Sequence, residues 1–163
     1  MKKAMVLLMA GVMVVLSACG GGDKNTATGD VDLQAYWDSL KETYEWEEGY
    51  LVDIEGEMLE SYYPGIGDIR TKQFIAKMPM MSSVVNEMVF MQCETEDEAA
   101  LAAAILQNRI DTQAEGGAWY PESMEAWGRG IVIQQGTYVG MIASAEHQDE
   151  ISESFNASAA VRI

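Results

Sequence analysis

The stretch VVNEMVFMQC at residues 84–93, with the TEDEAALAAAILQNRI that follows at residues 95–110, decides the fold. The first stretch is apolar on both faces around its centre, which predicts an interior strand that is covered on both sides or flanked by neighbours. The second stretch opens with a capping box, in which Thr95 serves the amides of the first turn and Glu98 reaches back. An interior strand is therefore followed directly by a helix.

Small apolar residues occupy one side of this helix. The stripe consists of Ala99, Ala102, Ala103, Leu106 and Ile110, and Leu101 and Ile105 widen it. Since alanine permits close approach, we expect the helix to pack tightly against the sheet until Gly116 and Gly117 end it. Three acids in the first turn and Arg109 in a later turn agree with the helix dipole.

Three more strands are predicted from short apolar runs, at residues 73–78, 131–134 and 138–143. The last two runs read as a hairpin about Gln135 and Gly136, with Ile133 opposite Tyr138. Further helices are expected after a cap at Asp30 or Asp32, from Asp53 with Met58 on its inner side, from Pro121, and over residues 148–155. The predicted fold is α+β: a four-stranded, mainly antiparallel sheet with one long helix packed on a face and flanking helices.

The N-terminal segment has the layout of a cleavable secretory signal. Lys2 and Lys3 precede an apolar run at residues 4–16. The run has 13 residues, short of the roughly 20 that a membrane-spanning helix needs. Leu16-Ser17-Ala18-Cys19 resembles a bacterial lipobox, which implies cleavage between Ala18 and Cys19 and lipidation of the Cys19 thiol. An ordinary secretory signal cut near Ala18 is the alternative that the residues leave open.

Three segments follow from this interpretation. Residues 1–18 are the lipoprotein signal peptide, residues 19–29 are the lipidated cysteine with a flexible tether, and residues 30–163 are a single globular α+β domain. The tether is the small and polar GGGDKNTATG at residues 20–29. A diacylated Cys19 would carry two chains, which hold a protein stably at a membrane whereas one chain holds it only marginally.

The charge of the chain restricts its partners. The formal net charge is −16, and it becomes −18 when Lys2 and Lys3 leave with the signal peptide. A protein this acidic is repelled by phosphate backbones and anionic headgroups, so we expect no nucleic-acid partner. The membrane contact is expected through the lipid on Cys19, at the extracytoplasmic face.

Candidate chemical groups are few. Glu87 interrupts the interior strand, where a carboxylate needs a partner or an exposed position. Cys93 ends the same strand and is interpreted as a small buried hydrophobe, and His147 as a residue in a loop that enters a helix. No cofactor is expected, because no phosphate loop or dinucleotide fingerprint occurs. No metal site is expected either, since Cys93 and His147 alone are too few zinc ligands and the methionines at 78, 80 and 81 read as an apolar connection rather than a copper site.

The pattern from Tyr62 to Phe155 resembles a known family, the small lipoproteins of Gram-positive bacteria built on a domain of unknown function. The resemblance rests on residues 63–66 (YPGI), 86–90 (NEMVF), the acid-capped alanine helix, 120–122 (YPE) and 136–139 (GTYV). It implies a membrane-attached extracytoplasmic domain, and it brings no activity, cofactor or catalytic residue.

Two functions follow from the sequence. The first is a membrane-anchored, non-catalytic binding or accessory module whose ligand is unknown. The alternative is a surface hydrolase that uses paired carboxylates, with Glu87 and a second acid that the sequence does not identify. Two converging carboxylates in a pocket would favour the hydrolase, and an exposed aromatic or apolar patch would favour the binding module.

Overall fold

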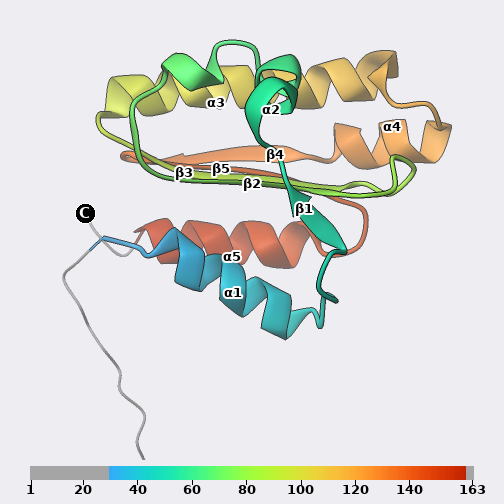
Figure 1. Cartoon of the computed structure of the whole chain (residues 1–163), viewed down its shortest axis with the longest axis horizontal. Helices are drawn as coiled ribbons and strands as arrows, with labels where there is room; N and C mark the ends of the chain where they lie inside the picture. The colour runs from blue at the N-terminus through green and yellow to red at the C-terminus, as the bar shows by residue number, and fades with distance from the viewer. Residues whose placement is uncertain (1–29, 161–163) are drawn as a thin grey trace, which may run out of the picture.

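Residues 30–160 are described by a computed structural model of the chain (Figure 1). The predicted signal peptide, Cys19 and the tether lie outside the described residues. Five α-helices, five strands and two short helical turns occur within them, in the order α1 (Leu33–Thr43), β1 (Leu51–Asp53), α2 (Gly56–Tyr62), η1 (Ile66–Asp68), β2 (Thr71–Pro79), β3 (Asn86–Cys93), α3 (Glu96–Thr112), η2 (Gln113–Gly117), α4 (Pro121–Gly128), β4 (Ile131–Gln135), β5 (Tyr138–Ser144) and α5 (Gln148–Ala160).

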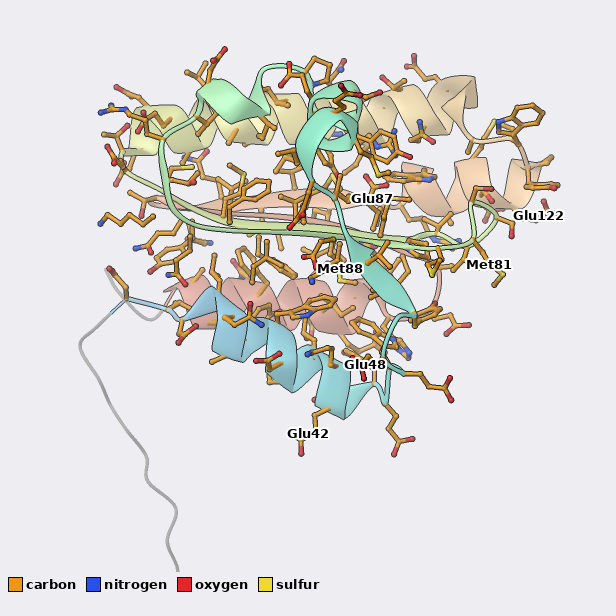
Figure 2. The ribbon with its side chains drawn as sticks, viewed as in Figure 1. Glu42, Glu48, Met81, Glu87, Met88 and Glu122 are labelled. Carbon is orange, nitrogen blue, oxygen red and sulfur yellow. The ribbon has the colours of Figure 1, made fainter. Side chains whose placement is uncertain are left out.

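The strands form one antiparallel sheet in the order β1-β2-β3-β5-β4. All eight residues of β3 and all seven of β5 are buried, which confirms the prediction of an interior strand at residues 84–93. Side chains alternate between the two faces along β3. Figure 2 shows the consecutive residues Glu87 and Met88 on opposite sides of the sheet.

Helices cover both faces of the sheet (Figure 1). On one face, α2, α3 and α4 enclose a core that includes Val89, Met91 and Leu106. On the other face, α1 and α5 enclose a second core that includes Phe90 and Phe155, whose rings stack at 5.1 Å. The α+β prediction is therefore confirmed. The expectation of one long helix with flanking helices was incomplete, because α1 and α5 form a full layer of their own.

The expected four-stranded sheet was wrong by one strand. β1 pairs with the edge of β2, where Leu51 faces Pro79 and Asp53 faces Lys77. Three residues are too few to show the alternation that reveals a strand in a sequence, and the pairing depends on an edge contributed by a distant segment. As a result, α2 begins at Gly56 instead of Asp53.

Local signals placed the start of α3 correctly. The Thr95 hydroxyl oxygen accepts a hydrogen bond from the Glu98 backbone N–H at 3.2 Å and donates to the Glu98 carboxylate at 3.0 Å. The apolar stripe was right in its centre but too wide, since Leu101 is 60% exposed.

The hairpin between β4 and β5 is shifted from its predicted register. Gln135 pairs with Tyr138, so the two-residue turn is Gly136-Thr137 and Ile133 faces Gly140. Gly136 takes the positive φ of 56° that this tight turn requires. Gly140 is needed for another reason, because a Cβ there would lie 2.5 Å from the Phe155 ring.

Candidate functional site

Glu87 lies on the central strand, on the face that α3 covers, and its side chain is only 5% exposed. Its Oε1 accepts hydrogen bonds from the Tyr63 hydroxyl at 2.6 Å and from Arg109 Nε at 2.9 Å. Its Oε2 accepts from Arg109 Nη2 at 2.9 Å. The prediction that this acid needs a partner is confirmed, and the partner is the Arg109 guanidinium, which binds the carboxylate in a bidentate manner.

Arg109 reaches Glu87 from the C-terminal half of α3 and passes between two aromatic rings. The guanidinium carbon lies 4.1 Å from the centre of the Tyr62 ring and 5.2 Å from that of the Trp127 ring. These distances allow cation–π attraction to both rings. A single buried ion pair thus joins the end of α2, the long helix α3, the short helix α4 and the central strand.

Burial and the charge of Glu87 shift the pKa values of its two partners, Arg109 and Tyr63. Burial alone would lower the pKa of Arg109, but the hydrogen bonds and negative charge of Glu87 raise it above its ordinary value. Burial, followed by the charge of Glu87, raises the pKa of Tyr63 well above its ordinary value. The phenol therefore stays protonated and serves as a hydrogen-bond donor to Glu87.

The Glu87–Arg109 pair lies beside a cleft of about 260 Å³. Aromatic walls come from Tyr62, Trp119 and Trp127, and Pro79, Ser82 and Val84 line it from the β2–β3 connection. Glu87 is the only carboxylate among the described residues that line the cleft. Hydrolysis by paired acids needs two carboxyl groups facing each other across a substrate, and this lining contributes one that is already bound to Arg109.

A π-helical turn shapes one side of the cleft. After Thr112 the hydrogen-bond pattern of α3 widens into η2, and Gly116 takes a φ of 128° that reverses the chain. Gln113 and Gly117 of this turn line the cleft. Such turns are rare and often occur at functional sites. Here the turn delivers Trp119 to the mouth of the cleft.

Large apolar side chains stand exposed on the two segments that line this cleft, the β2–β3 connection and the residues before α4. Trp119 is 92% exposed, Tyr120 55%, Met80 73% and Met81 62%. The two methionines come from the β2–β3 connection, and the two aromatic residues precede α4. The Ser123 hydroxyl donates to the Ser83 carbonyl oxygen at 3.3 Å and so joins these two segments. We call Met80, Met81, Trp119 and Tyr120 the distal surface.

Comparison with known protein families gives one match. The model of a domain of unknown function, DUF4358, matches residues 44–144, more than half of the chain. The chain belongs to this family. A comparison with curated proteins and a comparison with solved structures each gave no match.

The DUF4358 match runs from the residues before β1 through β5, so it contains the whole sheet. Glu87, Arg109 and Tyr63 fall within it, as does the distal surface. The helices α1 and α5 lie outside the matched residues, although together they cover one face of that sheet.

The other two candidate residues lie away from the cleft of the DUF4358 domain. Cys93 is fully buried at the far end of β3, roughly 20 Å along the strand from Glu87. Burial, with a smaller contribution from Glu98, raises the pKa of its thiol to about 11. The interpretation of Cys93 as a packed hydrophobe agrees with both observations.

His147 lies before α5, on the face of the sheet that α1 and α5 cover. Its ring stacks on Tyr44 at 4.2 Å, and Nε2 is 4.0 Å from the Glu146 carboxylate. The structure therefore separates Glu87, Cys93 and His147. Among residues 30–160, no three His, Cys, Asp or Glu side chains gather in a group fit to hold a metal ion.

A larger hollow of about 670 Å³ lies beside α1 and β1 of the DUF4358 domain, lined by Trp37, Trp46 and several carboxylates. Two of the five carboxylates that line it are paired with lysines of the chain, and one of these pairs is Lys41 with Asp38 at 2.8 Å. Lys77 pairs with Asp53 at 2.6 Å and lies over the Trp37 ring at 5.5 Å. We take the smaller cleft beside Glu87 as the candidate site despite the difference in volume, because it contains the buried Glu87–Arg109 pair and is bordered by the exposed Trp119.

Sequence reasoning found Glu87 and missed the residues around it. Arg109 follows Leu106 by three positions and precedes Ile110, so it borders the buried stripe of α3, and that position was the available signal. No sequence signal identified Tyr63 as a partner of Glu87, since a tyrosine next to a turn is usually explained by packing. Trp119 and Tyr120 follow two glycines and carry no periodicity that would indicate whether they are buried.

Proposed function

We propose that this protein is a membrane-anchored extracytoplasmic lipoprotein, like the small lipoproteins of Gram-positive bacteria, whose DUF4358 domain is a non-catalytic binding module. The observation that carries the binding role is the distal surface, where four large apolar side chains stand exposed on the two segments that line the cleft. Exposed apolar patches of this kind on a soluble domain usually mark interaction sites. The anchoring rests on the lipobox-like Leu16-Ser17-Ala18-Cys19.

The positions of the N-terminal end of the domain and of the distal surface support an anchored binding module. At the beginning of α1, the Val31 N–H donates to the Tyr138 hydroxyl at 2.8 Å and the Leu33 N–H to Gln73 Oε1 at 2.8 Å. Gln73 lies six residues before Pro79 on β2, about 20 Å along the strand. The tether therefore joins the domain at one end of the sheet, and the distal surface lies at the other end, near α4 in Figure 1.

The expected reach of the tether fits this arrangement. A Gly-rich tether of ten residues, as proposed for residues 20–29, would span about 17 Å on average. With Cys19 held in the outer leaflet, the distal surface would face away from the membrane and be open to partners. Within residues 30–160, no helix has both the length and the apolar character that crossing a bilayer demands.

Replacement of Cys19 by alanine tests the anchor. We expect the variant to appear in the medium or to accumulate unprocessed, while mass spectrometry of the parent protein shows an acylated N-terminal cysteine. A parent protein with a processed N-terminus and no acyl mass would contradict the anchoring.

Photo-crosslinking tests the binding role independently of the anchor. A benzoylphenylalanine at position 120 of the anchored protein is expected to form a discrete adduct in intact cells. The matched control is the same substitution at Leu101, which is equally exposed at 60% but lies about 17 Å along α3 from Thr112. Equal labelling from both positions, or none from position 120, would count against a binding surface at this end.

A further inference from the structure

We propose that the distal surface binds a protein segment in which one apolar side chain is flanked by lysine or arginine residues. This inference rests on the proposed binding function and adds the chemistry of the partner. Tryptophan, tyrosine, methionine and arginine are the residues enriched at protein interfaces. Three of these types form the distal surface, and the fourth, Arg109, lies in the cleft beneath it.

The cleft accepts an apolar anchor from the partner. Its volume of about 260 Å³ is slightly below the roughly 300–1,000 Å³ of sites for drug-sized ligands, so it suits a single side chain. Tyr62, Val84 and Trp127 give it apolar walls. The charge of Arg109 is already balanced by Glu87, so a charged anchor would be desolvated without gaining a counter-charge.

The rim of the surface selects for basic flanking residues. Glu115 on η2 and Glu122 at the start of α4 are exposed, and they form no ion pair with the described residues. Figure 2 shows Glu122 and Met81 at the same end of the molecule, and the Ser123–Ser83 hydrogen bond joins the segments that carry them. Arg129 follows the C-terminal end of α4, and its guanidinium pairs with Glu125 at 3.2 Å. Two exposed acids without an ion pair among the described residues therefore lie within four positions of Trp119 in the sequence.

Charge also argues against two other occupants. A second copy of the chain would bring the same two acids and a net charge of −16 against the first, which opposes self-association. An anionic bilayer would repel the rim in the same way, and the distal surface lies at the end of the sheet away from the tether. A basic protein segment is the occupant that complements both the patch and its rim.

Three labelled eleven-residue peptides test this inference with the full-length protein in a non-ionic detergent. The first has a leucine–phenylalanine–leucine centre flanked by four lysines on each side, the second has glutamates in place of the lysines, and the third has serines in place of the centre. Binding is measured by fluorescence anisotropy. We expect the first peptide to bind and the other two to bind at least about tenfold more weakly, since each lacks one half of the complementarity.

Variants locate the bound peptide. Trp119→Ala is expected to weaken binding of the first peptide at least about tenfold, as loss of a central aromatic anchor does, and Leu101→Ala to leave it unchanged. The double change Glu115→Gln with Glu122→Gln is expected to weaken it roughly two- to fivefold per charge removed. The matched control is Glu42→Gln with Glu48→Gln, which removes the same charge beside α1 (Figure 2).

Three results would overturn the inference. They are equal binding of the lysine and glutamate peptides, insensitivity of the first peptide to Trp119→Ala, and no binding of any peptide up to about 1 mM, the weak end of specific affinities. A crosslink from position 120 in cells together with any of these results would keep the proposed binding function and reject the basic partner. Absence of that crosslink would reject both.

Discussion

Substitution of Glu87 by glutamine tests the buried site most directly. The change keeps the size of the side chain but removes its charge, so Arg109 keeps a positive charge that is 13% exposed and has no counter-charge. The glutamine amide would also place N–H groups against a guanidinium that only donates. Breaking a buried pair in this way costs about 3–5 kcal/mol. Since the cleft gives Arg109 some access to water, we expect the lower end, about 3 kcal/mol.

Urea denaturation followed by tryptophan fluorescence measures this loss. For a domain of this size the same loss lowers the melting temperature by about 10 °C. The matched control is Glu125→Gln, which breaks an exposed pair with Arg129 (3.2 Å) and is expected to change the free energy of unfolding by less than about 0.5 kcal/mol. A Glu87→Gln loss as small as that of the control would refute the reasoning.

A double variant separates the cost of the unpaired charge from the cost of lost packing. Replacing both Glu87 and Arg109 by methionine removes the two charges together and keeps apolar volume in the site. We expect most of the stability of the parent protein to return, because buried ion pairs can often be exchanged for well-packed apolar residues. If the double variant is as unstable as Glu87→Gln alone, the uncompensated charge is not the cause.

Three further changes test the fold. Thr95→Ala is expected to cost about 1 kcal/mol through loss of the helix cap, and an unchanged urea midpoint would contradict it. Gly140→Ala places a Cβ 2.5 Å from an aromatic ring and is expected to cost about 1–3 kcal/mol, whereas Gly67→Ala is the tolerated control. Burial raises the pKa of the Cys93 thiol from 9.0 to about 11. The free energy that the neutral, buried thiol contributes to folding is therefore present below pH 9.0 and is lost as the pH rises towards 11. In a Cys19→Ala chain, iodoacetamide at pH 8 should therefore label Cys93 only after unfolding, and rapid labelling of the folded protein would contradict burial.

Some elements were predictable because their signals lie within a few residues. The cap of α3 depends on Thr95 and Glu98, which are three positions apart. The burial of β3 follows from the apolar run at residues 88–91, which does not alternate with polar residues. Gly136 marks the β4–β5 turn by its positive φ. The turn was placed one residue too early, so the expected partner of Ile133 was wrong by two positions, Tyr138 instead of Gly140.

Other features were decided by contacts between distant segments. Met58 was expected on the inner side of α2 and is 44% exposed, because the three-residue strand β1 changes where α2 begins and how it lies. The covering of the second face by α1 and α5 was also missed, since amphipathic stripes do not say which face of a sheet they cover.

The sequence alone determined that Glu87 sits in an apolar strand and needs a partner, because burial of a carboxylate is costly wherever the strand is placed. Only the tertiary structure decided that the partner is Arg109, 22 residues away, and that Tyr63 completes the pair from 24 residues in the other direction. The same holds for the distal surface. Met80, Met81, Trp119 and Tyr120 come to the same end of the sheet because the β2–β3 connection and the start of α4 meet there, and no local signal encodes that meeting.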